Sequence, residues 1–180
     1  MITATLKAGL AAIAIATSVA FPASASAPLK IDEIVHSPKP GHAEKSTEAA
    51  ARHFYAFWNT GDEADLKQAI APAFTDHTLP EGRPQGPEGP AFASKNFRAA
   101  VPDLSVEVRK MIIAGDYVTV HMIFRGHFTG AFGTTKGSGQ AIEFIATDLL
   151  KVTKGKVTDN WHIEDNLTLL TQMGIAKVGP

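Results

Sequence analysis

Four segments in the second half of the chain constrain the fold more than any other feature of the sequence. They are rich in Val, Ile, Thr and Phe, and they read LSVEVRKMIIAG (104–115), DYVTVHMIFRGHFTG (116–130), QAIEFIATDLLKV (140–152) and KVTDNWHIEDNLTLL (156–170). Gly-Asp, a loop rich in Gly, Thr and Lys, and Lys-Gly-Lys separate them. β-Branched and aromatic residues between such stretches are typical of strands joined by hairpins. The sequence therefore predicts a mostly antiparallel sheet.

Segments with helical spacing precede these strands, at residues 44–62, 63–74 and 90–101. In the first of them Phe54, Phe57 and Trp58 share one helical face. Pro72 ends the second helix and Pro102 closes the third, and FTDHTL between them has the composition of a short strand. Helices followed by a run of strands indicate an α+β fold, with the helices packed on one face of a strongly curved sheet.

Alternation along each strand predicts which side chains face the helices, because successive side chains point to opposite faces of a sheet. In the second long strand the inward set is apolar and comprises Val118, Val120, Met122, Phe124 and Phe128. The outward set comprises Tyr117, Thr119, His121, Arg125 and His127. The same test turns Val157, Trp161 and Ile163 of the last strand inward, together with Asp159 and Asp165.

Asp148 is the exception on an otherwise apolar strand face, which it shares with Ile142, Phe144, Ala146, Leu150 and Val152. A buried carboxylate is costly unless it is paired, hydrogen-bonded or protonated. Burial in an apolar pocket raises the pKa of an acid, and such a group can exchange protons at neutral pH. The alternative is a structural acid that Trp161 or a backbone amide holds in place.

Composition excludes several classes of protein. The 180 residues carry a formal net charge of −1, and no basic stripe indicates a nucleic-acid surface. The chain has no cysteine, so disulfides, thiolate catalysis and cysteine metal sites are excluded. The histidines form no H-x-x-x-H or H-E-x-x-H motif, and no metal site is expected.

The N-terminus has the layout of a secretory signal peptide, with Lys7, an uncharged Ala/Ile-rich run and small residues at its end. We predict a signal peptide at 1–25, a flexible lead-in at 26–43 and one domain at 44–180. Cleavage is expected after Ala25, with Ala27 as the alternative. The mature protein would be periplasmic or secreted and would have no membrane span, and a retained N-terminal anchor is the alternative.

A series of short motifs between about residues 51 and 174 resembles one known family. The motifs are FYAFWNTGDEADL, FTDH, GPEG, VPDL, GDYV, GHFTGAF, TDLLKV, GKVTDNW and QMG, in this order. Together they resemble the SnoaL-like polyketide cyclases (ester cyclases) of the NTF2-like superfamily. The resemblance implies a cone of helices on a strongly bent sheet that encloses an apolar pocket. It also implies a homodimer formed through the outer face of the sheet.

The resemblance also implies a chemistry without cofactor or metal, in which members close a ring by an intramolecular aldol reaction. Asp148 stands at the place of the family's general acid/base. His77 would lie near the pocket mouth and relay a proton or bind a substrate carbonyl, or it is a surface or capping histidine. The expected pocket wall comprises Trp161, Asp165, Phe128, Phe144, Met122 and Trp58. Phe128 stands where many members have a pocket histidine, and Asp165 would either extend a polar patch or cap the turn after the strand.

Two functions remain open at this point. One is a cofactor-free cyclase, isomerase or dehydratase that acts on a small apolar carbonyl compound through Asp148 and His77. The other is a non-catalytic binding or carrier protein in which Asp148 only orients a polar group of the ligand.

Overall fold

The computed structural model describes residues 27–38 and 41–179. The N-terminal half contains β1 (Lys30–Ile31), β2 (Ile34–Val35), α1 (His42–Thr60), α2 (Glu63–Ala69), β3 (Ile70–Asp76) and α3 (Glu88–Ala100). The C-terminal half contains β4 (Ser105–Ala114), β5 (Tyr117–Phe128), β6 (Ala131–Phe132), β7 (Thr135–Lys136), β8 (Gln140–Thr153), β9 (Lys156–Glu164) and α4 (Asn166–Gln172). The predicted α+β architecture is confirmed.

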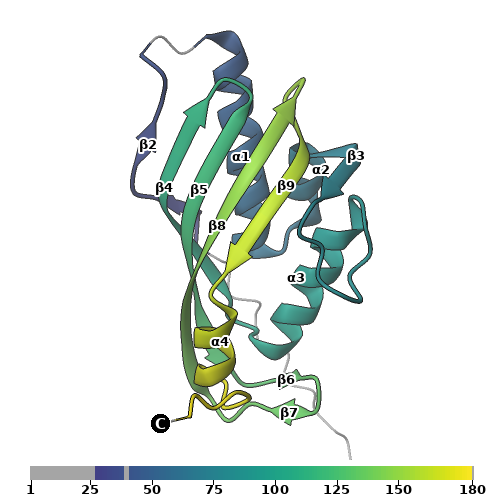
Figure 1. Cartoon of the computed structure of the whole chain (residues 1–180), viewed down its shortest axis with the longest axis vertical. Coiled ribbons are helices and arrows are strands. Elements are labelled where there is room, and N and C mark those ends of the chain that lie inside the picture. The colour runs from purple at the N-terminus through teal and green to yellow at the C-terminus, as the bar shows by residue number, and fades with distance from the viewer. Residues whose placement is uncertain (1–26, 39–40, 180) are drawn as a thin grey trace, which may run out of the picture.

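The main sheet has the strand order β1-β4-β5-β8-β9-β3, and β2 also pairs with β4. The four long strands β4, β5, β8 and β9 pair antiparallel, whereas β1, β2 and β3 run parallel to their neighbours. In Figure 1 the long strands bend strongly along their length, and helices α1, α2 and α3 lie on one side of them. The sheet is therefore curved and mostly antiparallel, as predicted.

The inward faces of β5 and β8 match the alternation in the sequence. The buried residues of β5 are Val118, Val120, Met122, Phe124 and Phe128, and those of β8 are Ile142, Phe144, Ala146, Asp148, Leu150 and Val152. They pack with α1, whose Phe54, Tyr55 and Phe57 are each no more than 1% exposed. Burying this apolar face provides the main driving force for the fold.

The predicted face assignment of β9 is wrong beyond Val157, because a β-bulge shifts its pairing with β8. Val152 pairs with Val157, but the next pair is Lys151 with Asp159, so Thr158 is an extra residue on β9. One extra residue sends every later side chain to the opposite face. Asn160 is buried at 7% exposure, whereas Ile163, predicted to point inward, is 75% exposed.

Several elements differ from the sequence expectation. β1 and β2 come from the predicted lead-in and pair with β4, and residues 166–172 form the helix α4 instead of continuing the last strand. The loop after β5 contains the short hairpin β6–β7. The predicted signal peptide lies outside the described residues. Among the helices of the described ranges, none has the length and apolar character needed to cross a membrane.

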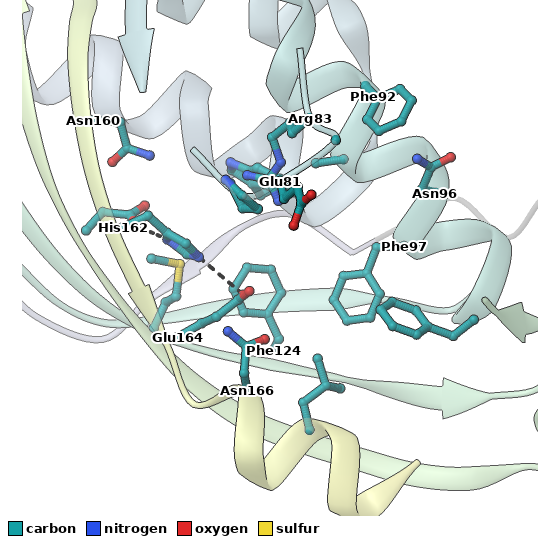
Figure 2. A pocket seen from close by; sticks show the side chains of 18 residues that line it. Glu81, Arg83, Phe92, Asn96, Phe97, Phe124, Asn160, His162, Glu164 and Asn166 are labelled. Carbon is teal, nitrogen blue, oxygen red and sulfur yellow. Dashed lines mark hydrogen bonds and ion pairs between the residues drawn. The ribbon is translucent and has the colours of Figure 1, made fainter. Parts of the chain in front are cut away.

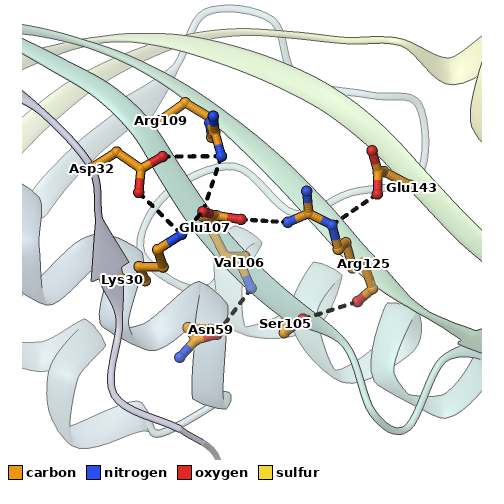
Figure 3. A network of polar contacts seen from close by, with 9 residues as sticks. All are labelled: Lys30, Asp32, Asn59, Ser105, Val106, Glu107, Arg109, Arg125 and Glu143. Carbon is orange, nitrogen blue, oxygen red and sulfur yellow. Dashed lines mark hydrogen bonds and ion pairs between the residues drawn. The ribbon is translucent and has the colours of Figure 1, made fainter.

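A polar network attaches β1 to the outer face of the sheet (Figure 3). At its centre Glu107 accepts hydrogen bonds from Lys30 and Arg109, and from Arg125 at 2.6 Å. The bonds from Lys30 and Arg125 lower the pKa of Glu107 to about 2, although burial opposes the shift. On the helix side, Asn59 accepts a hydrogen bond from the Val106 backbone N–H at 2.9 Å and so connects α1 to β4.

Candidate functional site

A cavity of about 430 Å³ lies between α3 and the inner face of the sheet, and α1, α4 and the loop after β3 complete its wall. This volume lies within the range of small-molecule sites. One side of the cavity is aromatic and consists of Trp58, Phe92, Phe97, Phe124 and Phe132. The rest of the lining is mostly polar and includes Glu81, Arg83, Asp148, Asn160, His162, Glu164 and Asn166, whereas Asn96 lies on α3 beside Phe92 and Phe97 (Figure 2). The expected pocket therefore exists, but only one of its sides is apolar.

The bulge at Thr158 creates the polar side. After the bulge the inward residues of β9 are Asn160, His162 and Glu164, and all three line the cavity. The carbonyl oxygen of the Asn160 side chain is buried and has no hydrogen-bond partner in the described part of the chain. Buried polar groups are usually paired, so this unpaired oxygen of a cavity-lining residue is an exception.

Asp148 lies at the centre of a hydrogen-bonded series that crosses from α1 to β9. The Tyr55 hydroxyl donates to Asp148 Oδ2 at 2.9 Å, and His162 Nδ1 donates to Asp148 Oδ1. On the other edge of the ring, His162 Nε2 lies 3.2 Å from Glu164 Oε2. Asp148 and His162 are direct cross-strand partners, so the sheet register itself brings them together.

The charges of this series follow from its contacts. Burial alone would lower the pKa of His162, but the hydrogen bonds that its ring donates to Asp148 and Glu164 outweigh burial and raise that pKa from 6.5 to about 10. Burial favours the neutral form of Glu164, but contact with His162 holds its pKa below the usual value. Burial and the charge of Asp148 raise the pKa of Tyr55 well above 10. At neutral pH the histidine is therefore an imidazolium held between carboxylates.

Three of the predicted site residues line the cavity: Asp148, Met122 and Trp58. Phe144 and Phe128 are buried but lie outside the lining. Phe144 stacks on Phe124 with ring centroids 5.1 Å apart, so it supports the aromatic side from behind. Whether Asp148 is catalytic stays a prediction.

His77, Trp161 and Asp165 do not meet Asp148. His77 stacks on Trp161 with ring centroids 4.3 Å apart, and its Nε2 lies 2.8 Å from Asp159 Oδ1. Trp161 pairs across the sheet with the exposed Leu149, which places it on the outer face. Asp165 caps α4 by accepting a hydrogen bond from the Thr168 backbone N–H at 3.0 Å, as in the capping alternative.

Sequence reasoning missed Tyr55, His162 and Glu164. If β8 and β9 paired regularly from the tight Lys154-Gly155 turn, Trp161 would lie opposite Asp148. The bulge adds one residue to β9, so His162 lies opposite Asp148 instead. The available signal was the polar series Asn160, His162, Glu164 at every second position, which competed with the apolar series Val157, Trp161, Ile163.

The residues described contain no group of three or more His, Cys, Asp or Glu side chains placed to hold a metal ion.

A model of the SnoaL-like polyketide cyclase family matches residues 48–173. The chain belongs to this family. The resemblance seen in the motifs is thereby confirmed, and membership supports a cofactor-free cyclase or isomerase kind of function. A search of curated proteins found no match.

Solved structures agree with the assignment to the SnoaL-like family. A Bacillus cereus protein proposed to be a polyketide cyclase is 40% identical, with a TM-score of 0.75 over 83% of this chain and 95% of its own. IdmH of Streptomyces antibioticus, also proposed to be a polyketide cyclase, is 26% identical, with a TM-score of 0.64 over 71% of this chain and 98% of its own. A Catenulispora acidiphila protein with a ketosteroid isomerase-like fold is 20% identical, with a TM-score of 0.56 over 73% of this chain and 97% of its own. At that identity the last likeness concerns the fold alone.

Proposed function

We propose that the chain is a cofactor-free acid–base enzyme that moves a proton on a carbon next to the carbonyl group of a small, mostly apolar compound. The observation that carries this proposal is the series Tyr55–Asp148–His162–Glu164 in the wall of a ligand-sized cavity. Ring closure, isomerisation and dehydration of carbonyl compounds all begin with such a proton transfer.

The cavity provides the parts that this chemistry needs. A carboxylate accepts the proton from carbon, and the His162 imidazolium stabilises the oxygen on which negative charge develops. The aromatic side, including Trp58, Phe97 and Phe124, gives an apolar substrate a surface to pack on and keeps water away from the reacting atoms.

Deuterium exchange into 2-tetralone, a flat ketone with acidic carbon-bound protons, tests the proposal. We expect the wild-type protein in D2O to accelerate loss of the C1 proton signal in NMR spectra over buffer alone. General acid–base catalysis contributes roughly 10²–10⁴-fold, so His162→Gln should lose most of the acceleration. Glu143→Gln, on the outer face of β8, is the matched control.

Binding without exchange would contradict the enzymatic proposal. Binding is observed as a shift of the Trp58 indole N–H resonance. A wild-type protein that binds 2-tetralone but exchanges it at the buffer rate would instead favour the carrier alternative, in which the same polar residues only orient the ligand.

We further propose that two copies associate through the outer face of the sheet. Ile145, Leu149 and Ile163 lie there at 47%, 38% and 75% exposure, and Leu167 at the start of α4 is 58% exposed. An apolar row of this kind is typical of an interface. Sedimentation should show a dimer for the wild type and a monomer for Ile163→Glu, and a monomeric wild type would contradict the proposal.

Export also remains a proposal, supported by the Lys7 and Ala/Ile-rich pattern of the N-terminus. N-terminal sequencing of the protein from its own host tests it. A mature chain that begins at Ser26 would support cleavage after Ala25, and an intact Met1 would contradict export by a cleaved leader.

A further inference from the structure

The three ionisable groups of the site differ in how far a ligand can reach them. Asp148 borders the cavity but is only 3% exposed, and each of its oxygens already accepts a hydrogen bond, from Tyr55 or from His162. A substrate that approached Asp148 would first have to displace one of these partners.

Glu164 lies on the opposite edge of the His162 ring and is open to the cavity. Its side chain is 24% exposed and its Oε2 contacts His162 Nε2 at 3.2 Å, a longer contact than the one between His162 and Asp148. In Figure 2 the Glu164 carboxylate extends from β9 into the cavity on the side of Phe124. This carboxylate is therefore the one that a molecule packed on the aromatic rings would meet first.

We propose that Glu164 is the catalytic residue that takes the proton from the substrate carbon, and that Asp148 is a positioning residue that acts through His162. Asp148 orients the ring through Nδ1 and keeps it protonated, so that Nε2 presents its proton toward Glu164 and the substrate oxygen. This inference rests on the proposed function, and it moves the acid–base role from the strand-face aspartate to a residue on the next strand.

The arrangement is similar to that of a Ser-His-Asp triad, in which the buried aspartate orients the histidine ring and does not itself transfer the proton. Here the histidine remains charged and a second carboxylate accepts the proton. The electron pair of the broken C–H bond moves onto the carbonyl oxygen, where the His162 N–H stabilises it, and Glu164 returns the proton in a later step.

A probe with a single proton-transfer step separates the two roles. In 5-nitrobenzisoxazole a base removes the C3 proton, the electron pair forms the nitrile, and the N–O bond breaks to give a coloured phenolate. The rates of the wild type, Glu164→Gln, Glu164→Asp and Asp148→Asn are measured from pH 5 to 9.5, after subtraction of the buffer rate. Glu143→Gln again serves as the control.

We expect Glu164→Gln to lose about 100-fold or more in kcat/KM, as loss of a general base predicts. Glu164→Asp should recover part of the rate, which a folding defect would not allow. Asp148→Asn should lose less, but its rate should decline at a pH about one unit or more below that of the wild type, because the imidazolium has lost one of its carboxylate partners.

The contrary results are distinct. The inference is overturned, while the proposed function stands, if the two variants exchange their predicted behaviour. In that case Asp148→Asn loses about 100-fold in kcat/KM with no shift of the pH profile, and Glu164→Gln keeps the wild-type rate. If the wild type is no faster than free acetate at equal concentration, both fall, because a carboxylate open to the cavity must be reachable by a flat molecule of this size.

Discussion

Raising the pH from 6.5 to 10 should destabilise this protein through a single residue, His162. In the folded chain its ring is held between Asp148 and Glu164, and its pKa is raised from 6.5 to about 10. In the unfolded chain both contacts are lost. Because the folded pKa is the higher one, the stabilisation is fully present below pH 6.5 and is lost progressively as the pH rises to about 10.

The size of the effect follows from these two values. A change in pKa from 6.5 to about 10 corresponds to roughly 5 kcal/mol, since each tenfold change in a proton affinity is worth about 1.4 kcal/mol. The total stability of an ordinary domain is about 5–15 kcal/mol, so the loss is a large part of it. Two neighbouring groups do not act in this window: the lowered pKa of Glu164 places its titration in acid, and the raised pKa of Tyr55 places its titration above pH 10.

Urea unfolding at half-unit steps of pH measures the effect. The contribution of His162 should be constant below pH 6.5, and above that pH the free energy of unfolding should fall by at most about 1.4 kcal/mol for each unit of pH. His162→Gln should lack this slope. A level free energy between pH 6.5 and 9 in the wild type, or equal slopes in the two proteins, would refute the assignment of an imidazolium to this site.

Three further predictions concern other parts of the molecule. Tyr55→Phe removes the 2.9 Å hydrogen bond to the buried Asp148 and should cost about 1–3 kcal/mol in urea unfolding, and a cost near zero would mean that the bond contributes nothing. Glu107→Gln should raise the pH of acid unfolding, because the pKa of Glu107 is lowered to about 2 and its stabilisation is lost only as the pH falls from 4.5 toward 2; an unchanged acid midpoint would contradict this. Gly126→Ala would place a Cβ 2.4 Å from Val101 Cγ1 and should lower the free energy of unfolding by about 1–3 kcal/mol, whereas an unchanged melting temperature would show that the neighbouring chain yields freely.

Much of the fold could be predicted because the patterns that determine it are local. Alternation on β5 and β8 identified the buried face, and this included the unusual position of Asp148. The short elements β1, β2, β6 and β7 could not be predicted, because strands of two residues show no period. The pairing of β1 and β2 depends on β4, which lies far along the chain, whereas β6 and β7 pair with each other across a short turn.

The site was only partly predictable, and the reason lies in one strand. Its polar side depends on the pairing register of β8 and β9, which a bulge changes without any marker such as glycine or proline at Thr158. Because Trp161 and Ile163 are apolar, the sequence pattern assigned them to the inner face, but in the structure they lie on the outer face. β-Propensity indicates which residues form a strand, but it does not give the register in which two strands pair.

The extra residue on β9 also has a consequence for how this cavity can change over evolution. Deleting Thr158 would remove the bulge but leave His162 opposite Asp148, because Asp159 would still pair with Lys151. If the bulge were lost while Thr158 was retained and paired with Lys151, Trp161 and Ile163 would face the ligand and His162 and Glu164 would face outward, with no amino acid exchanged. The strand thus carries a polar lining and an apolar lining on alternate positions, and the bulge decides which of them meets the ligand. Substitutions that favour or disfavour this one bulge are therefore a route by which the proposed proton-transferring site and an apolar binding cavity can alternate on the same scaffold.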